Sequence, residues 1–290
     1  MNNRPYTLFC DTTCDLPPER LAQMDCKLLP LTFEIDGRSY TTEDISMKEF
    51  YTRMRADAVT KTSQIAFGTY IDAFEKELAE GNDILYLAFS SGLSGSYSTS
   101  LLACDTLLEK YPDRKIIVVD SLAASSGEGL MLLYAEQKKR EGCSMEELEK
   151  WLLDNRESFC HVFTVDDLKY LFRGGRVSRA AAIAGTMLGI KPVLNVDDEG
   201  HLIPQAKVRG RKQSIKKLGE MIRERVSDKY ENKFVTMSHG DCIEDAKAAE
   251  AMMKEIFGED TEVIIAYTGP VIGAHSGPGT LALFFRGDHR

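Results

Sequence analysis

The segment at residues 83–110 constrains the fold of this 290-residue chain more than any other. An apolar run, DILYLAF, leads into a loop of small polar residues, SSGLSGS (90–96), and helical spacing follows the loop. This order is typical of a buried strand, a strand-to-helix loop and a helix in a parallel α/β sheet. Two similar runs, YTLFC (6–10) and KIIVVD (115–120), alternate with amphipathic stretches, so the first half predicts parallel α/β construction.

The first half also contains helix starts and one expected insertion. Ser46 and Ser144 each have a glutamate three residues later, which is the spacing of a capping box. The stretch at 26–44 reads as an extended segment that turns at Asp36-Gly37. We expect it to form a short, lid-like hairpin before the helix that begins near Ser46.

The second half of the chain has a different order of expected strands and helices. After CHVFTVDD (160–167) comes a hairpin pattern at 191–210, a basic amphipathic helix at 211–227, and a strand-helix-strand run. Hairpins mixed with helices predict a mixed or antiparallel sheet with helices against it. We therefore expect two domains: a parallel-sheet α/β domain at 1–159 and a mixed α/β domain at 160–290.

Composition excludes several classes of protein. The formal net charge of -9 argues against nucleic-acid binding as the main function and disfavours bulk binding to anionic membranes. The seven cysteines are scattered, with no paired CxxC spacing, which predicts reduced thiols and no metal site. The sequence has no signal-peptide core and no run of 18 apolar residues. We expect a cytoplasmic protein without a metal, cofactor or nucleic-acid partner.

The loop SSGLSGS is expected at the carboxyl edge of the parallel sheet, where α/β proteins bind ligands. Gly92 and Gly95 allow the backbone to approach a ligand, the following helix offers free N–H groups, and Ser91 and Ser94 add hydroxyl donors. This combination favours an anion. A serine-rich helix cap without a ligand is the structural alternative.

The same loop nearly matches a nucleophile elbow. GLSGS (92–96) resembles G-x-S-x-G, and Asp241 and His275 follow Ser94 in the chain order of α/β-hydrolases. Ser96 stands where the closing glycine belongs, which weakens a serine esterase reading. The phosphate-binding motifs G-x-x-x-x-G-K-[ST] and G-x-G-x-x-G are both incomplete.

Three other loops have a similar density of small polar residues: CDTTCDLP (10–17), TKTSQ (60–64) and GPVIGAHSGPGT (269–280). We expect several of these loops to converge at the same edge of the fold. His275, between glycine-rich segments, is a candidate hydrogen-bonding side chain in such a site.

Seven ordered motifs together resemble a known family. DTTCDLP, KTSQ, SSGLSGS, LFRGGRVS, LGIKPVL, HGD and GAHSGPGT span residues 11–280 and look like the motif set of the DegV family of bacterial fatty-acid-binding proteins. The resemblance implies a non-enzymatic carrier that holds one long-chain fatty acid in a tunnel between two domains. Thr62 and Ser94 match the family's carboxylate ligands, and His275 completes the polar network. Ile65 and Phe67 stand where the family pattern has prolines.

The physical requirements of a fatty acid agree with this resemblance. A buried carboxylate needs hydrogen-bond donors, which Thr62, Ser94 and His275 supply, with Ser91, Gly92 and Gly95 as further contacts. Apolar residues must enclose the tail, and the stretch at 180–194 is the expected tunnel wall, with candidate contacts at Ile183, Met187 and Ile190.

Basic residues suggest a partner. The resemblance implies that some members present the fatty acid to a separate kinase that makes acyl-phosphate. Arg173 and Arg209 are candidates for docking that kinase or for contacting phosphate. Transient membrane contact is also compatible with a lipid carrier. Two alternatives remain open: a serine esterase that uses Ser94, Asp241 and His275, and a regulatory module that binds a small molecule other than a lipid.

Overall fold

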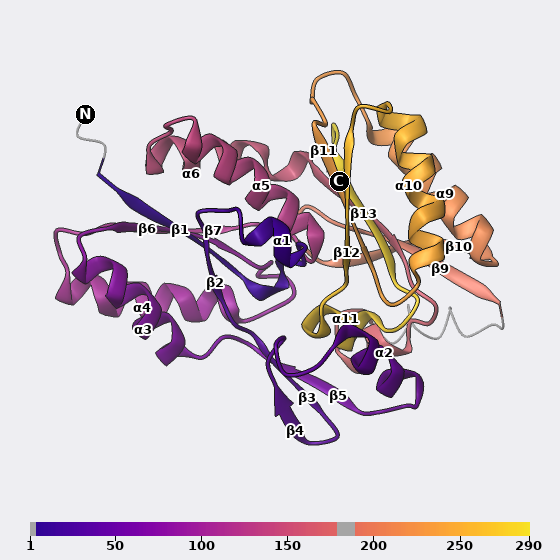
Figure 1. Ribbon diagram of the computed structural model, residues 1–290, viewed down its shortest axis with the longest axis horizontal. Coiled ribbons are helices and arrows are strands. Elements are labelled where there is room, and N and C mark those ends of the chain that lie inside the picture. The colour runs from indigo at the N-terminus through magenta and orange to yellow at the C-terminus, as the bar shows by residue number, and fades with distance from the viewer. Residues whose placement is uncertain (1–3, 179–188) are drawn as a thin grey trace.

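The computed structural model describes residues 4–178 and 189–290, which form three sheets and the helices around them (Figure 1). The N-terminal sheet has the order β2-β1-β6-β7, and all its neighbouring strands are parallel, as predicted. Its strands are β1 (Tyr6–Asp11), β2 (Lys27–Leu29), β6 (Asp83–Ala88) and β7 (Ile116–Asp120).

Helices cover both faces of the N-terminal sheet. Along β6, Leu85 and Leu87 pack into the core formed with α5, whereas Ile84 and Tyr86 pack into the core formed with α3. Every residue of β6 is buried, which explains its uninterrupted apolar run. The helices here are α1 (Pro18–Leu21), α3 (Phe67–Ala79), α4 (Ser96–Lys110), α5 (Ser126–Arg140) and α6 (Met145–Asn155), with 3-10 turns η1 (Thr12–Cys14) and η2 (Arg156–Ser158).

A small antiparallel sheet, β4-β3-β5, projects from the N-terminal sheet. The predicted turn at Asp36-Gly37 is confirmed, with both residues at positive φ, and it joins β3 (Thr32–Ile35) to β4 (Arg38–Tyr40). The structure contains more strands than the expected hairpin. The same segment first forms β2, which pairs with β1, and a later strand, β5 (Thr60–Ser63), pairs with β3. The helix α2 (Met47–Arg55) begins after Ser46, whose side chain accepts a bond from the Glu49 N–H.

The C-terminal sheet has six strands in the order β10-β9-β8-β13-β11-β12. Only β11 and β12 are parallel neighbours, so the predicted mixed sheet is confirmed. Its strands are β8 (Phe159–Thr164), β9 (Ile190–Val196), β10 (Leu202–Arg209), β11 (Phe234–His239), β12 (Glu262–Tyr267) and β13 (Leu281–Arg286). The associated helices are α7 (Lys169–Arg173), α9 (Arg211–Arg225), α10 (Ile243–Phe257) and α11 (Pro270–Ser276).

The helix α5 lies between the two large sheets, while α9 and α10 cover the outer face of the C-terminal sheet (Figure 1). One hydrophobic core contains residues of β1, β6 and β7 together with Phe163 and Phe284 of the C-terminal sheet. Because α5 packs on both sheets, the two units are continuous at this point, and a boundary near residue 159 remains a prediction. No helix in the described ranges is long and apolar enough to cross a membrane.

Candidate functional site

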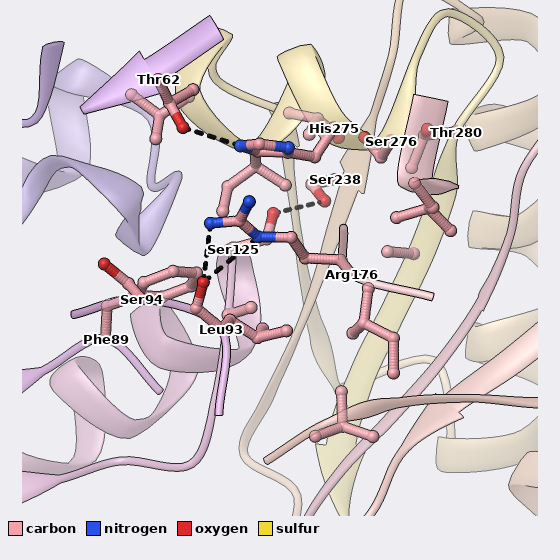
Figure 2. Close-up of a pocket in the computed structure, with 18 of the residues that line it drawn as sticks. Thr62, Phe89, Leu93, Ser94, Ser125, Arg176, Ser238, His275, Ser276 and Thr280 are labelled. Atoms are coloured by element: carbon pink, nitrogen blue, oxygen red, sulfur yellow. Dashed lines mark hydrogen bonds between the residues drawn. The ribbon is translucent and has the colours of Figure 1, made fainter. Parts of the chain in front are cut away.

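A cavity of about 260 Å³ lies where the N-terminal sheet, the small sheet and the C-terminal sheet meet. One end is polar and contains Thr62, Ser94, Arg176 and His275 (Figure 2). The remainder is lined mainly by apolar side chains: Leu31, Phe89, Leu93, Phe163, Leu171, Val196, Leu202, Val271, Ile272, Ala282 and Phe284. The cavity therefore has the amphipathic character that an acyl chain with a charged head requires.

The loop after β6 presents Ser94 in a fixed orientation. The Ser94 hydroxyl donates to Ser96 Oγ at 3.0 Å and accepts from the Ser96 N–H at 3.2 Å. Ser96 Oγ also accepts from the Ile65 N–H at 3.3 Å, which joins this loop to the segment that carries Thr62. A proline at position 65, which the resemblance led us to expect, would lack that donor, so Ile65 makes a bond that proline could not make. Phe67, the other departure, is exposed at the first residue of α3.

The loop glycines serve close packing. A side chain at Gly95 would place its Cβ 2.1 Å from the Gln64 amide oxygen, and one at Gly92 would lie 2.7 Å from the Glu199 carbonyl oxygen. Gly95 lines the cavity, whereas Gly92 faces the β9–β10 turn. Ser91 is exposed, and its N–H donates to Asp120. Ser91 and Gly92 are thus outside the cavity lining.

His275 and Thr62 come together from segments 213 residues apart, and His275 Nε2 lies 2.7 Å from Thr62 Oγ1. Burial, with a contribution from the Arg176 charge, lowers the pKa of His275 to about 4, so its ring is neutral near pH 7. A neutral ring that carries its proton on Nε2 donates to Thr62 Oγ1. The hydroxyl proton of Thr62 is then free to bond an anion.

Arg176 is the site residue that sequence reasoning missed. Its Nε and one terminal nitrogen donate to the Leu93 carbonyl oxygen at 3.2 and 2.9 Å, and the other terminal nitrogen donates to Gly174. Burial lowers the pKa of Arg176, and no carboxylate of the described residues forms an ion pair with it. The motif LFRGGRVS drew attention to positive charge, but it did not show which arginine turns inward.

Arg173, three residues earlier, points elsewhere. It ends α7 and is exposed, as is Arg209 at the end of β10. Of the expected tunnel-wall residues, Ile190 begins β9 and does not line the cavity. Ile183 and Met187 lie outside the described residues.

Three of the polar loops contribute residues to the cavity, so the expected convergence of several loops is confirmed, whereas the loop at residues 10–17 does not line it. Asp11 accepts from the Phe89 N–H at 3.2 Å and from Tyr86, which ties the end of β1 to the end of β6. Asp15 accepts from Ser125 at 2.5 Å, and Ser125 is bonded to Ser238 at 2.9 Å, both of which line the cavity. This loop braces the site from outside.

The residues of the esterase alternative do not form a catalytic chain. Ser94 is bonded to Ser96, His275 is bonded to Thr62, and Asp241 pairs with Lys48 and Arg55 of α2. Burial acts to raise the pKa of Asp241, but the hydrogen bonds and charges of Arg55 and Lys48 together outweigh it and hold that pKa below its usual range. Among the described residues, no group of three potential metal ligands is present.

Comparisons with known proteins agree with the motif set. The family described as "Uncharacterised protein, DegV family" matches residues 6–288. A DegV domain-containing protein from Clostridium perfringens is 42% identical over 288 residues, covering 98% of each chain. A second, from Streptococcus pyogenes serotype M3, is 36% identical and covers 98% of this chain and 99% of the relative.

Solved structures show the same fold. A DegV lipid-binding protein from Thermotoga maritima is 31% identical, with a TM-score of 0.84 and 99% coverage of each chain. Another protein of that organism, described as revealing a fatty-acid-binding function, is 31% identical, with a TM-score of 0.82 and coverage of 98% of this chain and 100% of that one. A stearic-acid-binding protein from Eubacterium ventriosum is 27% identical, with a TM-score of 0.85 and coverage of 97% and 98%. Together with the whole-length family match, these similarities establish that the chain belongs to the DegV family.

Proposed function

We propose that this protein is a carrier that binds one long-chain fatty acid without covalent chemistry. The observation that carries the proposal is the cavity's division into a polar end, with a cation that lacks a counterion, and an apolar remainder. Thr62 and Arg176 donate to the carboxylate, and His275 orients Thr62. Ser94 donates once its hydroxyl proton turns from Ser96 Oγ to the carboxylate. The Thermotoga maritima and Eubacterium ventriosum proteins, described as binding fatty acids, support the assignment.

The energetic roles of the two ends differ. Burial of about 15 methylenes at about 0.8 kcal/mol each contributes about 12 kcal/mol before the costs of association and chain ordering. The carboxylate contributes little net affinity, because its desolvation offsets much of the hydrogen bonding. The apolar part of the cavity therefore supplies affinity, and the polar end supplies orientation.

Native mass spectrometry with lipid extraction tests the proposal directly. We expect the purified protein to carry one fatty acid. Replacement of Ser94 by Ala should weaken fatty-acid binding by about 1–3 kcal/mol, since the buried carboxylate loses a donor. A protein without lipid that forms a covalent fluorophosphonate adduct at Ser94 would instead identify a serine esterase.

We further propose that the carrier presents the carboxylate to a separate fatty acid kinase, whose ATP supplies the phosphoryl group. The carboxylate oxygen attacks the γ-phosphorus, and acyl-phosphate and ADP are formed. Support comes from the partial exposure of Thr62, Ser94 and His275, and from exposed Arg173, which precedes the Gly174 that packs on His275. The protein at this end is open enough for a partner to reach the head group.

Charge reversal tests the docking surface. Arg173→Glu and Arg209→Glu should lower kinase-dependent acyl-phosphate formation while fatty-acid binding is unchanged. Arg223→Glu, on the exposed side of α9 and paired with Glu255, is the matched control and should leave both properties unchanged. Full phosphorylation of both Arg173→Glu and Arg209→Glu would contradict the proposal.

A further inference from the structure

His161 is a buried polar residue in the apolar part of the cavity. It lies on β8, is 1% exposed, and lines the cavity. Neither ring nitrogen makes a hydrogen bond of good geometry to any described residue, and the backbone of Phe159 interacts with the ring only weakly. The ring packs edge-on against Phe284, with centroids 5.2 Å apart and an interplanar angle of 88°.

The position of His161 separates it from the carboxylate end. His161 of β8 pairs with Phe284 of β13. Two residues along, toward Leu281 at the start of β13, Phe163 pairs with Ala282. Two residues along a strand correspond to about 7 Å, so the His161 ring lies well beyond the start of β13 at Leu281. Because Thr62, Ser94 and His161 line the same cavity, an acyl chain with its head at Thr62 and Ser94 would pass this ring as it fills the cavity.

The fold makes room for this ring specifically. A Cβ at Gly127 of α5 would lie 2.2 Å from His161 Nε2 and 2.7 Å from the Phe284 ring. Glycine at position 127 therefore leaves space for the imidazole between α5 and the sheet. Ser125 and Ser238, also in the cavity wall, bond each other, whereas His161 has no such partner.

The chemistry of the ring defines what would satisfy it. Burial, aided by the Arg290 charge and opposed by the Phe159 backbone, lowers the pKa of His161 well below its usual range, so the ring is neutral. A neutral imidazole has one donor and one acceptor nitrogen. Thr268 and Ser276 in the cavity wall also have unbonded hydroxyls, but Thr268 precedes and Ser276 ends α11, which carries His275 of the polar end, whereas His161 lies on β8. A buried group without a partner is costly, so a ligand that bonds His161 gains affinity.

We propose that His161 hydrogen-bonds a hydroxyl on the acyl chain, so that the preferred ligand is a long-chain fatty acid hydroxylated along its chain. A hydroxyl both donates and accepts, which matches either tautomer of the ring. The inference rests on the proposed fatty-acid-binding function and narrows its substrate class.

The test compares stearic acid with monohydroxystearic acids in which the hydroxyl is moved along the chain, by titration into delipidated protein. We expect one positional isomer to bind at least about fivefold more tightly than stearic acid, and its neighbours to bind less well. Equal binding of stearic acid and every isomer would overturn the inference and leave the carrier function intact. Binding of neither acid class would overturn both.

Variants separate hydrogen bonding from shape. His161→Phe keeps a ring against Phe284 and should remove the preference while stearic acid still binds. Phe163→Leu, on the same face of β8, is the matched control and should change both affinities by the same factor. A preference that persists in His161→Phe would overturn the inference. In the unmodified protein, the ¹⁵N shifts of the His161 ring should change with the hydroxylated acid and not with stearic acid, which tests the contact without any substitution.

Discussion

Two arginines three residues apart have opposite environments. The helix α7 ends at Arg173, and Gly175 at φ 75° turns the chain so that the Arg176 N–H donates to the Leu171 carbonyl oxygen. Arg176 is thereby directed at Leu93 beside the polar end of the cavity, whereas Arg173 stays exposed. A single left-handed glycine therefore decides which of the two charges faces the cavity.

The first prediction concerns the charge of Arg176. Arg176→Met should lower fatty-acid affinity about tenfold or more, because a hydrogen bond to a charged group contributes about 1.5–3 kcal/mol. Arg176→Lys should recover only part of the loss, since an ammonium cannot reproduce the forked contact with Leu93. Displacement of a fluorescent fatty acid measures the affinity, and thermal unfolding checks that the fold survives. Unchanged affinity in Arg176→Met would exclude Arg176 as a carboxylate ligand.

At the scale of elements, local signals in the sequence predict correctly where two helices begin. Both predicted starts are confirmed, and the Ser144–Glu147 pair forms the complete capping box. At Ser46 only the bond from the Glu49 N–H is present. The decisive element is α5, whose residues are all buried from Ser126 to Glu136 because it packs on two sheets. A helix buried on every side shows weak amphipathic patterning, which hides its central position from sequence reasoning.

The second prediction concerns the close packing of α5. A Cβ at Gly129 would lie 2.3 Å from the Cys14 carbonyl oxygen, which belongs to rigid backbone. Gly129→Ala should destabilise the protein by about 1–3 kcal/mol, because the helix must move away from η1. Gly68→Ala in α3, where nothing lies within 4 Å, is the control and should be neutral or stabilising by up to about 1 kcal/mol. Chemical denaturation measures both, and equal stability of the two variants would contradict the packing argument.

At the scale of the whole molecule, the buried carboxyl of Asp15 links the unit built on the N-terminal sheet to the unit built on the C-terminal sheet. Asp15 is bonded to Ser125 of the N-terminal unit, and through it to Ser238 of β11. Asp15 sits against Gly269, where a Cβ would lie 2.4 Å from its carboxyl oxygen. Burial raises the pKa of Asp15 to about 8, despite hydrogen bonds from Ser125 and the Gly269 N–H. The interface therefore holds this carboxyl in its protonated form near pH 7.

The third prediction follows from the sign of that shift. The folded state binds the Asp15 proton more tightly than the unfolded state, whose pKa is 3.8, so the stabilisation is complete below about pH 4 and is lost as pH rises to about 8. Asp15→Asn removes the titrating carboxyl. The unfolding free energy of this variant should therefore fall less steeply between about pH 4 and pH 8, by up to about 1.4 kcal/mol per pH unit. Denaturant unfolding at several pH values measures the slope. Exposed Asp113→Asn is the control, and a slope for Asp15→Asn equal to that of the control would contradict the burial argument.

The sequence by itself determined the fold class, the character of both large sheets, and the loops that carry Thr62, Ser94 and His275. These follow from local patterns, because strand alternation, helix caps and turn residues act over a few positions. Only the tertiary structure decided that Arg176 lines the polar end of the cavity, that Asp15 bonds Ser125 of the cavity wall, and that His161 has no hydrogen bond of good geometry in an apolar wall. Each of these depends on segments that are far apart in the chain and meet where α5 packs on two sheets, and no local pattern records such a meeting.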